Sequence, residues 1–359
     1  MSSSVRLYVH KILTVLLAGI LLLVTIGLAS FTLLLLPYKL LVCLLAKLFR
    51  PDLDSMVTGA VNVCFTLGTP ERPIANICVL MVMEGATDFQ KGLDLFQTRI
   101  LNYQEKGVFV YKRLKQSVSA FMGYPFLRTD ENFDLKNHFR TYDYTDGGLA
   151  FPNPARVTQQ ELEERLPALL LQPWKRDQSN WEFLLINNYC KNEQDMEKHT
   201  VIAFRMNHTI GDGYSTKRLL FRLFDPQEPS SKFKHNSSKE KDKKALMDKL
   251  KMCAAFPFKL FYDTAELAIR DLLGPKSGWA SVGERQLAVS ALGSGIPVDD
   301  IKAIKNELGA SYTSVLLAAV CAALGKFVPG GSRNSSSRKI GCIVPMPKPN
   351  HPATMTNHL

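Results

Sequence analysis

The sequence predicts a mixed α/β protein that is preceded by a membrane helix. Three observations lead to this fold class: a long uncharged apolar run near the N-terminus, short strand-like apolar runs such as Ile77–Met83, and segments of helical periodicity such as Leu93–Tyr103. The chain has 359 residues, enough for one large or two ordinary domains with a stable core. With 46% hydrophobic and 21% charged residues, it is neither disordered nor fibrous.

The N-terminal run Ile12–Leu36 contains 25 residues without a charge. As a helix it would reach roughly 37 Å, enough for the ~30 Å hydrocarbon layer of a bilayer. A signal peptide has an apolar region of about 7–15 residues, so we expect an uncleaved membrane helix. The segment Tyr38–Arg50 is too short and too charged to span, and is expected to lie among lipid headgroups or to form the returning limb of a hairpin. Basic residues flank both sides of the span, which leaves its orientation open.

The cysteines and the charge distribution limit the kinds of site and partner that the protein can have. The seven cysteines are dispersed without a C-x-x-C pair, which indicates neither a disulfide framework nor a zinc site. The net charge is +11, and residues Lys232–Lys251 hold eight lysines against three acids. This run begins with a linker-like stretch and continues as the helix-like segment Ala245–Leu273. Contact with anionic lipid and a solvated loop before an ordinary packed helix are equally good interpretations. No aromatic platform accompanies the charge, so a nucleic-acid partner is not expected.

The most informative segment runs from Thr200 to Ser215. Its first half alternates like a strand that ends at His208, and the preceding run Phe183–Cys190 is predicted to pair with it as a hairpin. The alternation puts two sets of residues on opposite faces of the strand. The more apolar face carries Ile202, Phe204, Met206 and His208, and the other carries Val201, Ala203, Arg205 and Asn207. Gly211 and Gly213 are expected to make a tight turn with unusual dihedral angles, after which leucines at helical spacing begin a helix.

This corner between a strand and a helix suits proton transfer. An imidazole at the end of an apolar strand is partly desolvated, which favours the neutral ring that accepts a proton from a hydroxyl, so His208 is a candidate general base. Asp212 precedes the helix, where the helix dipole favours a carboxylate, and is expected to brace the turn through an arginine or a backbone partner. Gly213 would let a substrate or another backbone approach closely. The plainer alternative is a hydrogen-bonded core histidine beside a common Asp-Gly turn.

The residues His208–Gly213 resemble the H-x-x-x-D-G core of the CoA-dependent acyltransferase superfamily, and within it the wax ester synthase/diacylglycerol acyltransferase family. Other segments resemble further stretches of that family in the correct order, over about residues 60 to 359: Asn132–His138, Leu169–Trp174 with Trp181-Glu182, Gly309–Val320, Val344–Pro347 and Asn357–Leu359.

The resemblance implies a chloramphenicol-acetyltransferase-like fold of two lobes with a tunnel between them. It implies catalytic roles for His208, Asp212 and Gly213, and substrate contacts for Asn207, Gly211, Ser215 and His138. Two positions depart from the family pattern: Asn207 replaces the first histidine of a frequent His-His pair, and Thr313-Ser314 replaces Asn-Asp. Only the start of the second lobe is expected, as in a fragment or truncated isoform whose tunnel is open on one side.

The implied domains are an N-terminal membrane helix with an interfacial segment (1–50), the first lobe (51–225), a basic linker with a helical crossover (226–285) and the start of the second lobe (286–359). The implied reaction esterifies a long-chain alcohol or diacylglycerol with acyl-CoA, giving a wax ester or triacylglycerol without a metal or other cofactor. With the predicted N-terminal helix, we expect a single-pass protein of the endoplasmic reticulum or plasma membrane. The acyl-CoA pool implied by the resemblance is cytosolic, so the catalytic domain is expected in the cytosol.

Two alternatives stay open. His138 and Asp143 have the H-x-x-x-x-D spacing of glycerolipid acyltransferases, although no E-G-T-R-like motif follows them. The second alternative is a membrane-tethered lipid-binding or interaction protein with a degenerate acyltransferase lobe. The sequence contains no G-x-S-x-G elbow, H-E-x-x-H helix or complete phosphate-binding loop.

Overall fold

The computed structural model describes residues 3–57, 59, 68–191, 197–224, 258–269, 272, 295–327 and 354–356. The chain divides into two units, which are considered separately: residues 1–41, 230–285 and 320–337 form one, and residues 42–229, 286–319 and 338–359 form the other. The basic run Lys232–Lys251, most of the segment Ala245–Leu273 and the strand expected at Val344–Pro347 lie outside the described residues.

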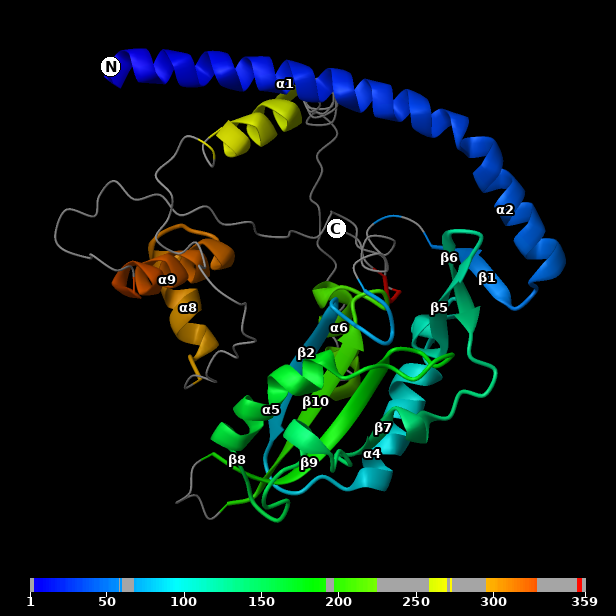
Figure 1. Ribbon diagram of the computed structural model, residues 1–359. Helices are drawn as coiled ribbons and strands as arrows, with labels where there is room; N and C mark the ends of the chain where they lie inside the picture. The colour runs from blue at the N-terminus through cyan, green and yellow to red at the C-terminus, as the bar shows by residue number, and fades with distance from the viewer. Residues whose placement is uncertain are drawn as a thin grey trace. The chain divides into compact units, whose positions relative to one another are not determined.

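Two helices form the N-terminal part of the chain (Figure 1). Helix α1 spans Ser3–Leu34 and helix α2 spans Leu36–Phe49. Within α1, the stretch Tyr8–Leu34 is long and apolar enough to cross a membrane, a property that signal sequences share. Pro37 stands in the first turn of α2, where a missing backbone N–H removes no helical hydrogen bond.

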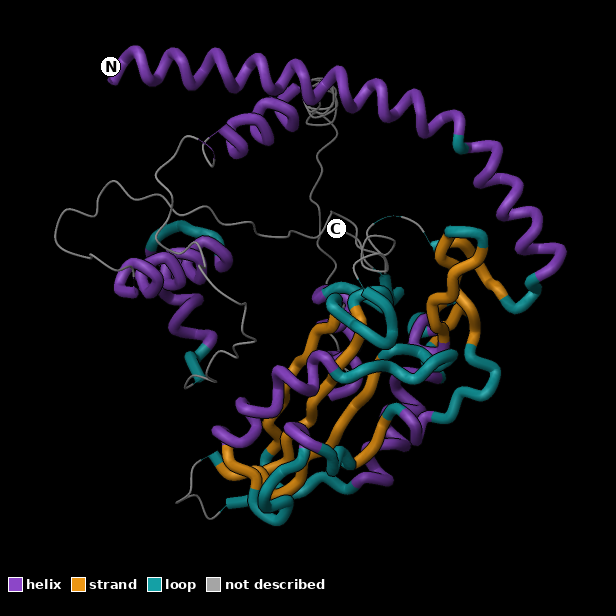
Figure 2. Tube along the Cα trace, viewed as in Figure 1, coloured by secondary structure: helices purple, strands orange, loops and turns teal. Residues whose placement is uncertain are grey.

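The main sheet belongs to the second unit and has the order β2-β10-β9-β7 (Figures 1 and 2). Strands β2 (Asn76–Met83) and β9 (Trp181–Cys190) flank β10 (His199–Asn207), and both run antiparallel to it. The predicted hairpin is therefore confirmed. Two short strands pair parallel with β9: β7 (Phe139–Thr141) and β8 (Val157–Thr158). The mixed α/β fold expected from the sequence is thus present.

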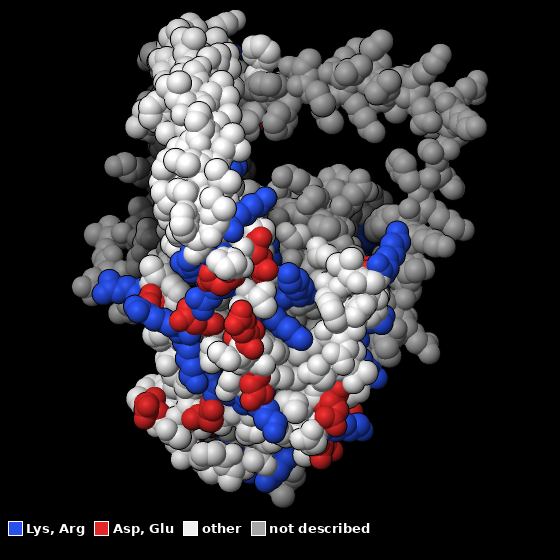
Figure 3. Space-filling model, turned by 90° about the vertical axis from the view of Figure 1, so that its right-hand side faces the viewer, with Lys and Arg blue, Asp and Glu red and all other residues white. Residues whose placement is uncertain are grey.

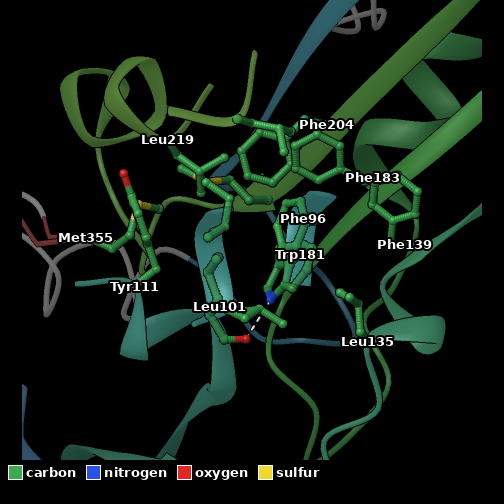
Figure 4. Packing of buried hydrophobic residues seen from close by; sticks show 14 of the residues in the cluster. Phe96, Leu101, Tyr111, Leu135, Phe139, Trp181, Phe183, Phe204, Leu219 and Met355 are labelled. Atoms are coloured by element: carbon green, nitrogen blue, oxygen red, sulfur yellow. Dashed lines mark hydrogen bonds between the residues drawn. The ribbon is translucent and has the colours of Figure 1, made fainter. Parts of the chain in front are cut away.

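Strands β9 and β10 are buried on both faces of this sheet. One face packs against α4 (Phe89–Phe96), the π-helical turn Gln97–Leu101 and α6 (Gly213–Phe224) in a core that contains Phe204, Met206 and Trp181 (Figure 4). The other face, which includes Val201 and Ala203, packs against α5 (Gln159–Leu171). The predicted assignment of alternate residues to two faces is confirmed, but the less apolar face is also covered and buries the charged side chain of Arg205.

Local sequence explains where α5 begins. The Thr158 hydroxyl accepts a hydrogen bond from the Glu161 backbone N–H, and the Glu161 carboxylate accepts one from the Thr158 N–H, so the pair forms a capping box. This fixed start leads α5 across the sheet to Leu171, near the strand end that carries His208.

Smaller elements complete the description. A second sheet has the order β1 (Leu53–Met56), β6 (Tyr124–Thr129), β5 (Gln116–Phe121), and a two-stranded hairpin joins β3 (Gln104–Glu105) to β4 (Val108–Phe109). Residues 258–269 are helical. Towards the C-terminus lie α8 (Val298–Glu307) and α9 (Tyr312–Phe327), and α9 covers most of the helix expected at Gly309–Val320.

Candidate active site

His208 lies directly after the last residue of the central strand β10. Its backbone N–H donates to the Ala75 carbonyl at 2.6 Å, and the Asn207 N–H donates to the Asn180 carbonyl at 2.8 Å. These two bonds fix the end of β10 to the segments that enter β2 and β9. The His208 side chain is partly exposed, so it is not sealed inside the core.

The turn after His208 is held by backbone and side-chain hydrogen bonds. The Ile210 N–H donates to the Asn207 carbonyl at 3.0 Å, while the Thr209 N–H donates to the Asn207 Oδ1 at 3.0 Å. The half-buried guanidinium of Arg113 donates through Nη1 to the Thr209 carbonyl at 3.1 Å, and desolvation lowers the pKa of Arg113. These bonds fix the backbone on both sides of the candidate catalytic residue.

Asn207 joins this turn to a cluster of polar side chains. Its Nδ2 donates to the Oδ1 of Asn76 at 3.2 Å, and the same oxygen accepts from Trp174 Nε1 at 3.0 Å. The Nδ2 of Asn76 donates to the Leu170 carbonyl near the end of α5, at 2.6 Å. In this arrangement both ends of the Asn207 amide stabilise the turn, and a contact with substrate stays a prediction.

Asp212 caps helix α6, which begins at the next residue. Its side chain is 2% exposed and accepts a hydrogen bond from the Ser215 backbone N–H at 2.8 Å, while its carbonyl accepts from the Thr216 N–H at 2.9 Å. A carboxylate at this position satisfies a free N–H of the first turn and interacts favourably with the helix dipole. The predicted backbone partner of Asp212 is confirmed.

The two glycines of the motif act differently from the prediction. Neither Gly211 nor Gly213 has a positive φ, so the expectation of unusual dihedral angles is wrong. The turn needs none, because the reverse turn from Asn207 to Ile210 and the cap at Asp212 already change the chain direction. A Cβ on Gly211 would lie 2.9 Å from Cε of Met355 and 3.2 Å from Cβ of Ser215, so a side chain there would displace the flexible end of Met355 and press on Ser215. No atom lies within 4 Å of a Cβ built on Gly213, so the space beside it is open to a ligand.

Ser215 contacts a segment close to the C-terminus. Its hydroxyl donates to the Thr356 carbonyl at 2.8 Å and accepts from the Thr356 N–H at 3.2 Å. The Asp212 N–H donates to the same carbonyl at 3.2 Å, and Met355 is buried in the core shown in Figure 4. Residues 354–356 therefore pack directly on the motif, and a substrate contact by Ser215 stays a prediction.

His138 lies in the aromatic core. It is 3% exposed, and its ring stacks on Trp181 at 4.7 Å and on Phe133 at 5.0 Å between ring centroids. Its Nδ1 lies 2.8 Å from the Trp181 carbonyl, which can only accept, so the proton is on Nδ1. Desolvation by burial lowers the pKa of His138, which keeps the ring neutral. These contacts give His138 a packing role, and its contact with substrate stays a prediction.

The alternative pair of His138 and Asp143 is not assembled as a catalytic dyad. The Asp143 carboxylate forms an ion pair with Arg140, whereas the His138 Nδ1 faces a backbone carbonyl. Among the residues that the structure describes, no group of three or more His, Cys, Asp or Glu side chains is placed to hold a metal ion.

The sequence predicted no supporting role for three residues that hold the motif: Asn76, Trp174 and Arg205. Arg205 is 1% exposed, and its Nη1 donates to the carbonyls of Leu169 and Gln172 at 2.7 and 2.6 Å, at the end of α5. Its guanidinium also lies 3.8 Å from the centroid of the Trp174 ring. Two of these residues could have been found in the sequence as a polar or charged residue inside an apolar run: Asn76 at the start of β2 and Arg205 within β10.

Replacement of Asn76 by alanine tests this support. The change removes the acceptor for Trp174 Nε1 and for Asn207 Nδ2 together, so we expect a loss of about 1–3 kcal/mol in the free energy of unfolding. Urea denaturation of the full chain in detergent measures it. Asn102→Ala is the matched control, because that asparagine is exposed and its Oδ1 accepts from Gln97 Nε2 in an exposed hydrogen bond. Equal effects of both substitutions would contradict the inferred role of Asn76.

Known proteins give one family match and several distant structural ones. The sequence profile of the wax ester synthase/diacylglycerol acyltransferase catalytic domain matches residues 61–263. No curated protein matches the chain. Among solved structures, the wax ester synthase/diacylglycerol acyltransferase from Marinobacter aquaeolei VT8 is 20% identical with a TM-score of 0.33, over 47% of this chain and 38% of that one.

Two further solved structures are similar to part of the chain. The X-domain from teicoplanin biosynthesis is 16% identical with a TM-score of 0.32, over 48% of this chain and 32% of that one. The first condensation domain of the calcium-dependent antibiotic synthetase is 11% identical with a TM-score of 0.32, over 47% of this chain and 37% of that one. The chain thus spans less than two fifths of each of these three proteins. Because the family profile extends over more than half of the chain, the protein belongs to the wax ester synthase/diacylglycerol acyltransferase family.

Proposed function

We propose that the protein is an acyl-CoA-dependent O-acyltransferase that esterifies a long-chain alcohol or diacylglycerol. One observation carries the proposal. The family's H-x-x-x-D-G motif occupies the corner between β10 and α6, with the His208 side chain partly exposed while Asn207 and Asp212 are buried and hydrogen-bonded. A proton acceptor at a rigid position with access from outside is what the reaction requires.

The reaction needs one base and no covalent enzyme intermediate, because a thioester already carries an activated acyl group. His208 takes the proton from the acceptor hydroxyl as the oxygen attacks the thioester carbonyl. The carbon–sulfur bond then breaks, and the imidazolium returns the proton to the leaving CoA sulfur. The turn bonds of Asn207 and the cap of Asp212 hold the position of the base, which lowers the entropic cost of bringing two substrates together.

Helix α1 suits this chemistry as an anchor. Long-chain alcohols, diacylglycerol and the ester products partition into lipid, and the stretch Tyr8–Leu34 has the length and composition to hold the catalytic lobe there. The acyl-CoA pool implied by the reaction is cytosolic. The proposal therefore places the lobe on the cytosolic side of the endoplasmic reticulum or plasma membrane.

Expression in cells that lack neutral-lipid synthesis tests the activity. We expect wax ester or triacylglycerol to accumulate with the native chain and with His199→Gln, which alters a histidine at the opposite end of β10, but not with His208→Ala. No ester with any version, in membranes that contain the full-length chain, would favour a lipid-binding protein with an inactive lobe. Equal accumulation with His208→Ala would exclude His208 as the base.

Membrane orientation has a separate test. The sequence holds N-x-S acceptor patterns at Asn236-Ser237-Ser238 and Asn334-Ser335-Ser336, both outside the described residues. A cytosolic lobe never meets the lumenal glycosylation machinery, so we expect no change in electrophoretic mobility on deglycosylation. A shift that disappears when both asparagines are replaced by glutamine would place the lobe in the lumen and contradict a cytosolic acyl-CoA supply.

A further inference from the structure

Helix α2 carries its large apolar side chains on the side that faces away from the protein. Leu40, Leu44 and Leu48 recur every fourth residue and are 68, 54 and 64% exposed. Together with Leu41, which is 47% exposed, they form what we term the leucine face. An exposed apolar face of this kind marks a contact with another molecule or with a membrane.

The opposite side of α2 is the side bound to the protein. Val42 and Ala46 are 0 and 2% exposed and pack against Phe126 of β6. A helix that covers a core ordinarily turns its largest apolar residues inward and its polar residues outward. Here the small residues point inward and the leucines point outward, so packing against the second sheet leaves the leucine face available.

The charges of α2 follow one edge of the leucine face. Lys39 and Lys47 are eight residues apart, with Cys43 between them, and this row lies beside the row of Leu40, Leu44 and Leu48 on the helix surface. The helix contains no acidic residue. By contrast, Figure 3, which faces the side of the molecule that carries α2, shows acidic and basic side chains interspersed over the lobe.

We propose that α2 is a membrane-surface helix, with its leucine face inserted among the acyl chains and with Lys39 and Lys47 at anionic headgroups. Three observations select a bilayer as the occupant. The face is continuous leucine, its edge is cationic, and α2 begins two residues after α1, whose stretch Tyr8–Leu34 has the length and composition of a membrane span. A basic edge beside an apolar face is the pattern of helices that lie in the plane of the interface.

The contact between α2 and β6 gives the insertion a consequence for the lobe. Because Val42 and Ala46 pack on Phe126, a helix fixed in the interface also fixes the sheet β1-β6-β5 beside the headgroups. The chain is then attached to the membrane at a second place besides α1. This inference is independent of the reaction proposed for His208.

Brominated lipids test the insertion, because they quench tryptophan only within the acyl region. The full chain carrying Leu44→Trp is reconstituted in vesicles of phosphatidylcholine and phosphatidylserine, with and without dibrominated acyl chains. Phe109→Trp is the matched control, since Phe109 is 46% exposed on the β3-β4 hairpin of the same unit. We expect an additional quenched component for Leu44→Trp and none for Phe109→Trp, relative to the native chain.

Other outcomes for Leu44→Trp would overturn the proposal. Quenching by aqueous iodide instead of by bromolipid would show a leucine face in water. Protection from both quenchers would show that the face is covered by protein, most simply by a second copy of the chain. Leu44 points away from the lobe, so the substitution is expected to leave the core around Phe126 intact, and an unchanged thermal unfolding midpoint checks this.

The charge of the lipid is tested with paired lysine variants. Lys39→Gln with Lys47→Gln is expected to lower the ratio of inserted to free α2 in phosphatidylserine vesicles by about fivefold per lysine, read from the Leu44→Trp quenching. Lys91→Gln with Lys136→Gln, two exposed lysines elsewhere on the lobe, should leave that ratio unchanged. An equal fall with both pairs would assign the effect to overall charge and contradict a specific role for α2.

Discussion

Replacement of His208 by glutamine is expected to lower kcat for ester formation by about 10²–10⁴-fold while the KM for acyl-CoA changes little. Glutamine keeps a polar side chain of similar length but cannot accept a proton. The hydrogen bonds from the His208 backbone N–H to Ala75, from the Thr209 N–H to Asn207 and from Arg113 to the Thr209 carbonyl do not depend on the imidazole. The substitution therefore removes the base and keeps these three bonds of the turn.

The measurement is steady-state kinetics of the full chain in detergent or vesicles with acyl-CoA and a long-chain alcohol. His199→Gln is again the matched control, because it changes a histidine of the same strand at the end far from the motif. A kcat for His208→Gln within tenfold of the native value would show that another group accepts the proton. A large rise in KM with an unchanged kcat would instead indicate that His208 binds substrate.

The strand β10 and the position of the motif at its end could be predicted because the signals are local. Alternation from Thr200 to Asn207 sets a period of two, and leucines from Leu219 onward set a helical period. These periods placed the strand, the helix and the corner between them correctly. The cap at Asp212 was also predictable, because Asp directly before a helix has one preferred backbone partner.

The supporting contacts of the site could not be predicted, because they join residues that are distant in sequence. Asn207 is bonded to Asn76, which lies 131 residues earlier, and Asn76 to Trp174, 98 residues later. Likewise, the close approach of Met355 to Gly211 is a contact that no local pattern reveals. The turn was predicted to depend on glycine conformations, whereas hydrogen bonds from Asn207 produce it with ordinary dihedral angles.

The buried ion pair between β9 and β10 could not be predicted from local sequence patterns either. Glu182 and Arg205 face each other across β9 and β10, and the Arg205 Nε donates to Glu182 Oε1 at 2.6 Å. Their side chains are 5 and 1% exposed. Arg140 donates to the other carboxylate oxygen at 2.5 Å, so one acid holds two guanidinium groups. Strand alternation placed Arg205 on the second face, but only the register of the hairpin shows that its partner is Glu182.

Glu182→Leu is expected to lower the free energy of unfolding by about 3–5 kcal/mol, because it leaves the charge of Arg205 buried without a counter-ion. The double variant Glu182→Leu with Arg205→Met should lose less than the sum of the two single variants, since it removes the unpaired charge. Arg140 does not change this expectation, because its side chain is 22% exposed and retains its ion pair with Asp143.

A double-mutant cycle measured by urea denaturation of the full chain gives the coupling directly. Strict additivity would contradict the pairing, whereas a residual cost in the double variant fits the loss of the Arg205 bonds to the carbonyls of Leu169 and Gln172 at the end of α5.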